Sequence, residues 1–514
     1  MDSLPDELLV TICEDIASPV TSFTSPMVHD ASRDLAALCA TNHRLKRIAT
    51  PLLYHSIDCR MENRDTHLVD FLRTLQEAPD LRRHIKSIRH RPHIGSSYKD
   101  KIYQDGSVDQ RGGNWIRRMI LSTAKELQLP QANTIYHDWM KGDDIPLALA
   151  ALQTPELEQL GARYPYNTTN SREAPFLLEA LVRAALGKPL GATHGFEKLR
   201  VLYLEFWDSS EWPIATIAPL VLLPSLQDLS LTRWTSPYYD DLTHYPNNYV
   251  FGLPPVWPVI SCNLTRLALH RPRASSAVIA GLINTCKTLT SFECTSPITR
   301  EGGDWFANIS AALSKHSDTL EHLGIGLSNT SQTHRMYYSL YNVRPSAALH
   351  RLSSIRLPLF TTASHSDYMS METNIPTSVE NLHLDIPKGA EETAEIYFSY
   401  FLDACIRGAF PHLKYIRLRF KRNCFLDDFP FPFTKYEPPF KVQGVRLDAM
   451  FNSFAKEAEL PDPITEHRIK AVFPGHYDYW AKTSFVEDTC FIFAGTFKDV
   501  GSVIELEQTY WQGF

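Results

Sequence analysis

The sequence lacks the features that mark several large classes of protein. It has no apolar run approaching the about 18 residues of a membrane-spanning helix, and its first residues, MDSLPDELLV, carry acids where a secretory signal carries bases. Its net charge of -7 at pH 7 gives no overall positive field that would attract the phosphates of a nucleic acid. We therefore expect neither export nor membrane insertion, and no nucleic-acid partner.

The cysteines are scattered along the chain. The nine cysteines form no C-x-x-C pair that would begin a zinc site, and their number is odd. Such cysteines are typical of reduced, mostly buried thiols inside the cell. We expect a cytoplasmic and/or nuclear protein without a metal site.

The motifs of common enzyme families are also missing. There is no G-x-S-x-G, no phosphate-binding loop, no H-E-x-x-H and no calcium-loop spacing. The glycines of GIG (324–326) lack the third glycine and the acidic residue of a dinucleotide site. The sequence predicts no catalytic residue and no cofactor. A hydrolase or transferase with a site assembled from distant loops stays an alternative, whose sign would be a deep pocket with strongly shifted pKa values.

What the chain does have is a leucine-rich motif, L-x-x-L-x-L with substitutions, that keeps recurring past residue 150. The copies are LRVLYL (199–204), LQDLSL (226–231), LTRLAL (264–269), LTSFEC (289–294), LEHLGI (320–325), LSSIRL (352–357), VENLHL (379–384) and LKYIRL (413–418). The spacing is irregular and slightly longer than in typical leucine-rich repeats, which indicates a degenerate array of such repeats.

Each copy predicts a strand whose leucines point to one side, and the apolar residues between copies predict a return helix. Examples of such helices lie within 276–290, 305–321 and 394–414. Stacked units of this kind give an α/β fold, a curved solenoid with parallel strands inside and helices outside. The segments 84–90 and 156–162 read as earlier, weaker strands.

The first residues follow a different pattern. In SLPDELLVTICEDIA (3–17) the apolar residues recur at helical spacing, Pro5 suits the first helical position, and acids follow it. A second helix is expected in the stretch from Asp30, and Thr50 is expected to cap a third that begins at Pro51. So small a three-helix unit buries little apolar area, so it is expected to pack on the rest of the chain or on another protein.

This stretch resembles the F-box family. The family's opening Leu-Pro-x-Glu-(Leu/Ile) is matched by residues 4–8, its Asp-Leu-x-x-Leu by residues 34–38, and PLLYHSI (51–57) looks like the close of fungal members. Two departures are the insertion ASPVTSFTSPMVHDASR (17–33), where the family has a short turn, and Leu45, where an aromatic residue is common. The insertion is expected to be a surface loop.

The resemblance implies a non-catalytic substrate-recognition subunit of an SCF-type (cullin-RING) ubiquitin ligase. The F-box would bind the Skp-type adaptor, and the solenoid would bind a target protein. The implied adaptor contacts are Leu4, Pro5, Glu7, Leu8, Ile12, Ile16, Leu35, Leu38, Leu45, Ile48, Pro51 and Leu52. In one alternative these residues dock the helices onto the chain's own solenoid. In another the protein is a repeat scaffold without any ligase.

Target binding is expected on the strand faces and on the loops that leave the strands. The segment 233–257 is long and dense in Tyr, Trp, Pro and Asn, and aromatic residues with polar tips favour interfaces. The predicted target contacts are Trp207, Trp234, Tyr238, Tyr239, Tyr245 and Trp257. The alternative is that these rings hold the segment against the solenoid.

The predicted organisation has four parts. They are the F-box-like helical module (1–58), a linking region with weak first repeats (59–155), the leucine-rich-repeat-like solenoid (156–440) and a C-terminal segment that caps the open end of the sheet (441–514).

Overall fold

The computed structural model divides into two compact units, the first ending at His322 and the second beginning at Leu323. The residues that the structure describes are 4–17, 28–59, 66–90, 110–130, 132, 134–135, 144–164, 175–206, 214–235, 261–295, 305–326, 349–358, 375–386, 391–420, 433–452, 492–494, 497–500 and 503–506.

The chain begins with three helices, α1 (Asp6–Ala17), α2 (Val28–Thr41) and α3 (His43–Leu53). We call residues 4–53 the helical module. Its own core contains Leu9, Cys13, Leu35, Leu45, Ile48 and Ala49. Because these buried side chains come from all three helices, the module has an interior of its own.

The boundaries of α2 and α3 differ from the prediction. The second helix already begins at Val28, so the end of the 17–33 insertion is helical and not a surface loop. The break falls at Asn42, whose side chain accepts a hydrogen bond from Leu45 N at 2.8 Å. Pro51 does not start a helix but lies in the last turn of α3, where its missing N–H removes one backbone hydrogen bond.

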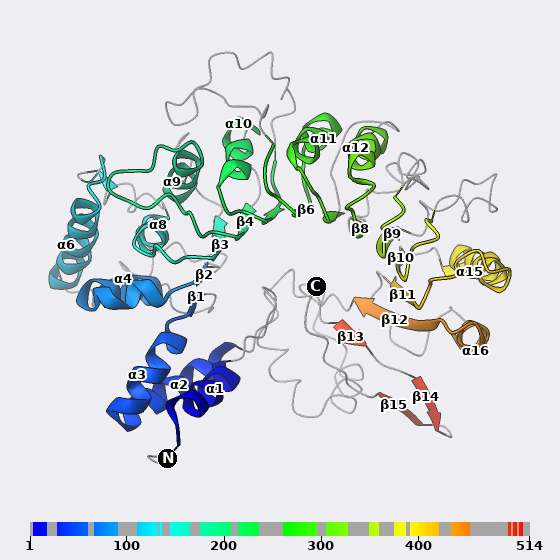
Figure 1. Ribbon diagram of the computed structural model, residues 1–514, viewed down its shortest axis with the longest axis horizontal. Helices are drawn as coiled ribbons and strands as arrows, with labels where there is room; N and C mark the ends of the chain where they lie inside the picture. Colours follow the sequence, from blue (N-terminus) through cyan, green and yellow to red (C-terminus); the bar gives the residue numbers. More distant parts are fainter. Residues whose placement is uncertain are drawn as a thin grey trace. The chain divides into compact units, whose positions relative to one another are not determined.

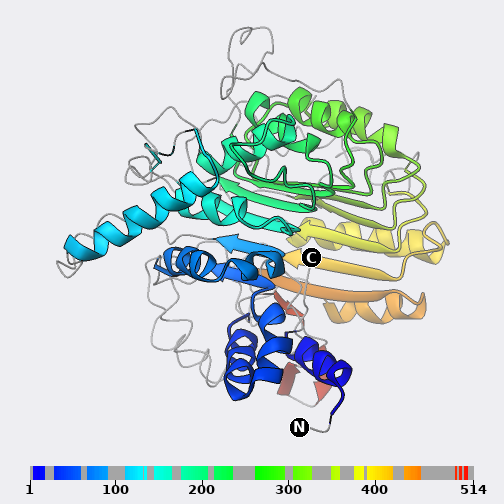
Figure 2. The same cartoon turned by 60° about the vertical axis from the view of Figure 1, so that its left-hand side comes forward.

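The last turn of α3 leads directly into the sheet of the first unit. The strands of that sheet are β1 (Ser56–Cys59), β2 (Ser87–His90), β3 (Gln159–Tyr164), β4 (Val201–Phe206), β5 (Asp228–Thr232), β6 (Arg266–His270) and β7 (Ser291–Thr295). Each pairs in parallel with the next along the chain (Figure 2). Strand β8 (His322–Gly326) begins at the last residue of this unit.

Helices and short 3₁₀ segments connect these strands. They are α4 (Thr66–Glu77), η1 (Pro79–His84), α6 (Gln110–Glu126), α8 (Ile145–Leu152), α9 (Phe176–Ala185), α10 (Ile214–Ile217), η2 (Ala218–Leu222), α11 (Ser276–Thr285), α12 (Trp305–Leu313) and η3 (Ser314–His316). The connecting helices lie along one side of the strands (Figure 1). The α/β fold with parallel strands and covering helices is confirmed.

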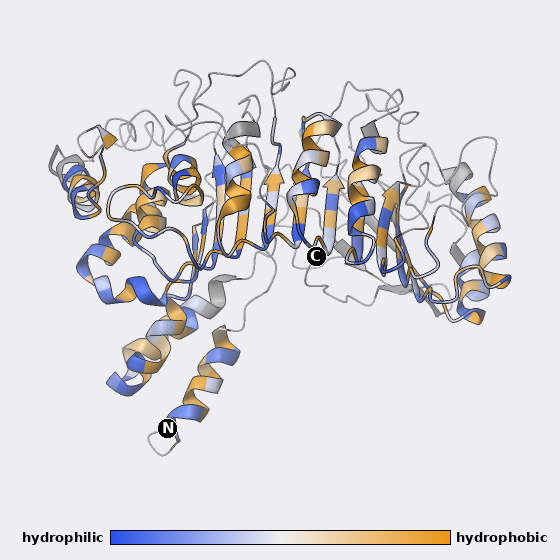
Figure 3. Cartoon of the chain, turned by 45° about the horizontal axis from the view of Figure 1, so that its top comes forward, coloured by the Kyte–Doolittle hydropathy of each residue, from blue (hydrophilic) through white to orange (hydrophobic). Residues whose placement is uncertain are grey.

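The leucines of the repeated motif form the core between strands and helices. In β5 buried and half-buried residues alternate, as period-two geometry requires, and strands in Figure 3 likewise alternate in hydropathy. In register, Leu202 pairs with Leu229, and Leu229 with Leu267, and all three are buried. Each leucine thus packs in a row that continues from one repeat to the next.

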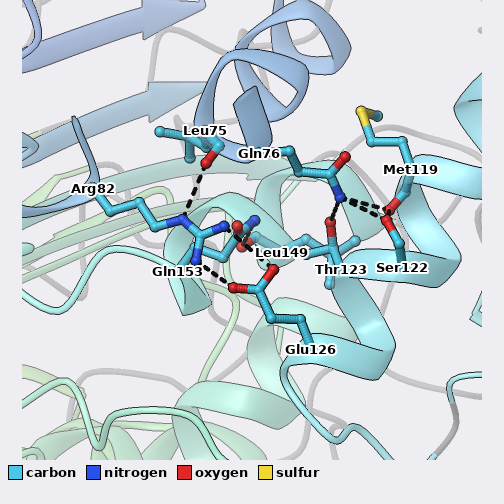
Figure 4. Close-up of polar contacts among 9 residues, drawn as sticks. All are labelled: Leu75, Gln76, Arg82, Met119, Ser122, Thr123, Glu126, Leu149 and Gln153. Atoms are coloured by element: carbon cyan, nitrogen blue, oxygen red, sulfur yellow. Dashed lines mark hydrogen bonds and ion pairs between the residues drawn. The ribbon is translucent and has the colours of Figure 1, made fainter. Parts of the chain in front are cut away.

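Polar contacts attach α6 to the helices before it (Figure 4). Gln76, near the end of α4, donates to Met119 O at 3.0 Å and to Ser122 Oγ at 2.9 Å, both in α6. Arg82 of η1 donates to Leu75 O at 3.2 Å and pairs with Glu126 at 2.5 Å. The described elements α4, η1 and α6 of the segment predicted as a linking region therefore contact one another within the first unit.

The second unit repeats the same arrangement. Its parallel strands are β9 (Ser354–Pro358), β10 (Asn381–Ile386), β11 (Tyr415–Phe420) and β12 (Arg446–Asn452), and its helices are α15 (Glu391–Ile406) and α16 (Phe433–Val442). Strand β13 (Ile492–Ala494) pairs antiparallel with the end of β12, and β14 (Phe497–Val500) forms a hairpin with β15 (Val503–Leu506). Pairing with β13 covers part of the free edge of β12.

Candidate functional site

Helix α1 has one buried face and one exposed apolar face. Leu9 is 3% exposed and packs in the module core, whereas its neighbour Leu8 is 51% exposed. Ile12, one turn later, is 46% exposed. Residues four apart on a helix lie side by side, so Leu8 and Ile12 form a single apolar surface. We call this pair the apolar face of α1.

The segment before α1 is fixed to α3 by charge. Arg44 Nε donates to Asp6 Oδ1 at 2.6 Å, and the same guanidinium donates to Leu4 O. Arg47 donates to the other carboxylate oxygen of Asp6. The hydrogen bond from Arg44, then that from Arg47, lowers the pKa of the Asp6 carboxyl below its ordinary value. Pro5, which is exposed, is therefore presented on a segment held at both ends.

The predicted adaptor contacts fall into three groups by burial: exposed, half-buried and buried. Pro5, Glu7, Leu8 and Ile12 are exposed. Leu4, Ile16, Leu38, Pro51 and Leu52 are half-buried. Leu4, Ile16, Leu38 and Leu52 pack against the module core.

Leu35, Leu45 and Ile48 are buried inside the module, so the prediction that they contact a partner directly is wrong. Three short helices need an interior, and these side chains fill it together with Leu9 and Cys13. Helical spacing identifies an apolar stripe, but it does not distinguish the stripe that faces a partner from the stripe that faces the neighbouring helix.

Of the predicted target contacts, only Trp234 lies within the described residues. Trp207, Tyr238, Tyr239, Tyr245 and Trp257 lie outside the described residues. Trp234 is among the largest fully buried side chains, so it is a core residue and not a surface contact.

The local backbone explains the burial of Trp234. Directly after β5, Arg233 has a φ of 58°, in the left-handed region, and its N–H donates to His270 O at 2.6 Å. The carbonyl of Trp234 then accepts from Arg273 N at 2.7 Å. The chain therefore turns and continues alongside the next repeat after β5 ends, and the indole is left in the core.

A polar network that the sequence analysis missed lies at the carboxyl ends of the strands of the first unit. Arg163 of β3 pairs with Glu205 of β4 at 2.9 Å, and both side chains are nearly fully buried. Tyr203 Oη donates to Glu205 Oε2 at 3.4 Å, and Thr232 Oγ1 donates to Tyr203 Oη at 3.3 Å. The sequence does contain a signal for this pair, because Arg163 and Glu205 occupy the same position of their motifs. The strand register pairs the two residues.

A second polar network crosses the strands of the second unit. Arg356 donates to both carboxylate oxygens of Asp385, at 3.3 and 3.2 Å, and Arg446 donates to Asp448 at 3.0 Å. Tyr415 donates to Asp448 and accepts from Arg417 Nε at 2.8 Å.

The ring of Tyr415 also lies beside two guanidinium groups. The central carbons of Arg417 and Arg446 are 5.0 and 5.9 Å from the ring centre. Burial, followed by the bond to Asp448, raises the pKa of Tyr415 to about 12, so the phenol is neutral at pH 7. The neutral phenol donates to the Asp448 carboxylate and accepts from Arg417, so it links two charged groups on the strand face.

The charged groups at the amino-terminal ends of the strands line a shallow hollow of about 350 Å³. Lys86 pairs with Glu158 at 3.1 Å, and Lys198 pairs with Glu156. Within the described ranges no group of three or more His, Cys, Asp and Glu side chains is arranged to hold a metal ion. Over the same ranges, no helix combines the length and the apolar character needed to cross a bilayer.

In comparisons with known proteins, no family model matches the chain and no curated protein matches it.

Proposed function

We propose that the protein is the substrate-recognition subunit of an SCF-type ubiquitin ligase. In this proposal the helical module is an F-box that binds the Skp-type adaptor, and the repeat units bind a target protein. The chain itself carries out no bond chemistry. The observation that carries the proposal is the apolar face of α1, which stays exposed beside the fixed segment Leu4–Asp6.

The exposure of Leu8 and Ile12 counts against the alternative in which α1 docks on the chain's own repeats. A face made for internal docking would be covered by the chain, yet each of these side chains keeps about half of its area exposed, 51% and 46%. A contiguous apolar pair of this kind is typical of the centre of a protein interface. Leu35, Leu45 and Ile48 would contribute by holding α2 and α3 in place behind that face.

The order of elements supports a division of labour within the first unit. The module joins β1 at its amino-terminal end, because α3 ends at Leu53 and β1 begins at Ser56. The segments 207–213, 236–260 and 296–304 follow the carboxyl ends of their strands. In parallel sheets, loops at the carboxyl ends are the usual places for recognition. A target held there and an adaptor held by α1 would be tethered in one complex, which raises the local concentration of target near the ligase.

The size of the expected effect follows from the burial that binding would add. Truncating or charging a central interface residue costs about 2 kcal/mol or more, which is about a 30-fold loss of affinity. Leu8→Asp and Ile12→Asp place a carboxylate in the contact without touching the module core. Each is therefore expected to weaken adaptor binding by at least about 30-fold, while leaving the far-ultraviolet circular dichroism unchanged.

The test measures binding of the purified full-length protein to a purified Skp-type adaptor by biolayer interferometry. Ile396→Asp is the matched control, because Ile396 is 47% exposed on α15, outside the module. The control should bind like the wild type. If Leu8→Asp and Ile12→Asp bind as tightly as the control, the proposed contact is refuted. If the intact protein does not bind at all, the proposal fails and the alternative of a repeat scaffold without a ligase is favoured.

A further inference from the structure

Cys262 and Cys286 lie side by side in the first unit, away from the helical module. Their sulfur atoms are 3.9 Å apart, and both are free thiols with buried side chains. The two residues form an isolated parallel bridge, in which Cys262 N donates to Thr285 O at 2.7 Å and Lys287 N donates to Cys262 O at 3.2 Å. Two backbone hydrogen bonds, one to each neighbour of Cys286, therefore keep Cys262 and Cys286 opposite each other.

This geometry is close to that of a cystine. Neighbouring strands are about 4.8 Å apart, which is within the range of about 4.4 to 6.8 Å between the Cα atoms of a disulfide. The sulfur atoms must approach by a further distance of about 2 Å to bond. Rotation of the side chains supplies most of that approach, since the backbone is already paired.

The surroundings make the two sulfur atoms chemically unequal. Hydrogen bonding with Cys286 is the main cause that lowers the pKa of Cys262 below its ordinary value, and Thr285 Oγ1 lies 3.6 Å from the Cys262 sulfur. The same contact, with burial, raises the pKa of Cys286. Of the two, Cys262 is the residue whose thiolate is favoured, and the thiolate is the form of cysteine that reacts with oxidants.

Other described cysteines have a different environment. Burial raises the pKa of Cys405 and of Cys59 to about 12 in each case, and it raises the pKa of Cys13 and Cys294 as well. These thiols stay protonated at neutral pH. Cys294 therefore serves as a matched control, because it is buried in β7 of the same unit.

We propose that Cys262 and Cys286 are a redox modification site that closes to a reversible disulfide when the protein meets a hydroperoxide. The Cys262 thiolate attacks one oxygen of hydrogen peroxide, so an S–O bond forms, the O–O bond breaks, and the departing hydroxide takes a proton to become water. The Cys286 sulfur then attacks the sulfenic sulfur of Cys262. An S–S bond forms, and the second hydroxide leaves with the Cys286 proton as water. Two thiols and one peroxide thus give one disulfide and two waters, and a dithiol reverses the step by exchange.

The cross-link would enclose most of one repeat. The residues between the two cysteines include β6 (Arg266–His270) and α11 (Ser276–Thr285). Because a disulfide restricts the unfolded chain, the oxidised protein is expected to melt at a higher temperature than the reduced protein.

The test treats the reduced full-length protein with graded hydrogen peroxide and maps disulfides by mass spectrometry of non-reducing digests. The expected result is a peptide joining Cys262 to Cys286 that disappears on treatment with dithiothreitol. In Cys262→Ser and in Cys286→Ser this peptide should be absent, because each substitution removes one of the two sulfur atoms. Cys294→Ser should behave like the wild type.

Two results would overturn the proposal. One is wild-type protein in which other cysteines are oxidised while Cys262 and Cys286 stay unlinked. The other is a link between Cys262 and Cys286 that dithiothreitol does not reverse. The wild-type disulfide map needs no variant, so it decides the question even where a serine substitution unfolds the chain.

Discussion

Replacing Leu9 and Leu8 separately by alanine tests whether the two faces of α1 have different roles. The two leucines are neighbours in one helix, but Leu9 is 3% exposed and Leu8 is 51% exposed. Removing a buried leucine loses its burial and leaves a cavity, which costs about 2 to 5 kcal/mol. The module core is small and its helices are short, so the site relaxes more easily than a large core. We expect a loss of about 2 to 3 kcal/mol for Leu9→Ala.

Leu8→Ala removes a side chain that is already half in water. We expect it to lower the stability of the module by less than about 1 kcal/mol. The difference of about 2 kcal/mol corresponds to a change of about 30-fold in the equilibrium for opening the module.

Native-state hydrogen exchange of the full-length protein, read by mass spectrometry of peptides from the three helices, measures this equilibrium directly. The helices of Leu9→Ala should exchange about 30-fold faster than those of Leu8→Ala. Equal rates in the two variants, or faster exchange in Leu8→Ala, would show that the buried and exposed faces of α1 have been assigned the wrong way round.

Three further predictions concern the first unit. Glu205→Ala leaves the buried Arg163 without its carboxylate and should lower the free energy of unfolding by about 3 kcal/mol, measured by denaturant titration; a loss below about 1 kcal/mol would mean that water screens the pair. Trp234→Ala should cost about 3 to 5 kcal/mol in the same titration, because the ring is fully buried, whereas an unchanged midpoint would return Trp234 to the surface. Burial lowers the pKa of His194, whose Nδ1 accepts a hydrogen bond from Phe196 N at 3.1 Å. Neutral His194 therefore stabilises the fold above a pH of about 6.5, the pKa in the unfolded chain. This contribution is lost as the pH falls through the lowered pKa of the folded protein. The melting temperature should therefore decrease from pH 7.5 to pH 5, and it should decrease less in His194→Asn; an equal decrease in the two proteins would exclude His194 as a cause.

The repeated motif allowed the strands of both units to be predicted from sequence, because alternation is a local property. The pattern LQDLSL (226–231) places two leucines on one face, and β5 (Asp228–Thr232) buries them both. The order of copies along the chain also gave the order of paired strands within each unit, since neighbouring repeats stack on each other.

The details of the helical module could not be predicted in the same way. Asn42 and Pro51 both carry boundary signals, and the choice between them depended on a cap that Asn42 forms and on the position of Pro51 in a last turn. Likewise, Leu8 and Leu9 are equally apolar, and only the packing of α2 and α3 decides which one is buried.

Contacts between residues far apart in sequence were also beyond the pattern. Arg44 and Asp6 are 38 residues apart, and Cys262 and Cys286 are 24 residues apart. No periodicity links such positions. They meet because two helices, or two neighbouring repeats, bring them together, so their chemistry follows from the fold and not from the local sequence.

The most direct test of the central claim is a hydrogen-exchange comparison of the full-length protein alone and saturated with the purified Skp-type adaptor. If the helical module binds the adaptor, exchange should be slower in peptides that contain residues 4–17, where Pro5, Leu8 and Ile12 are exposed, and unchanged in β4 to β7. Protection confined to the strands, or no protection in residues 4–17 at saturating adaptor, would contradict it.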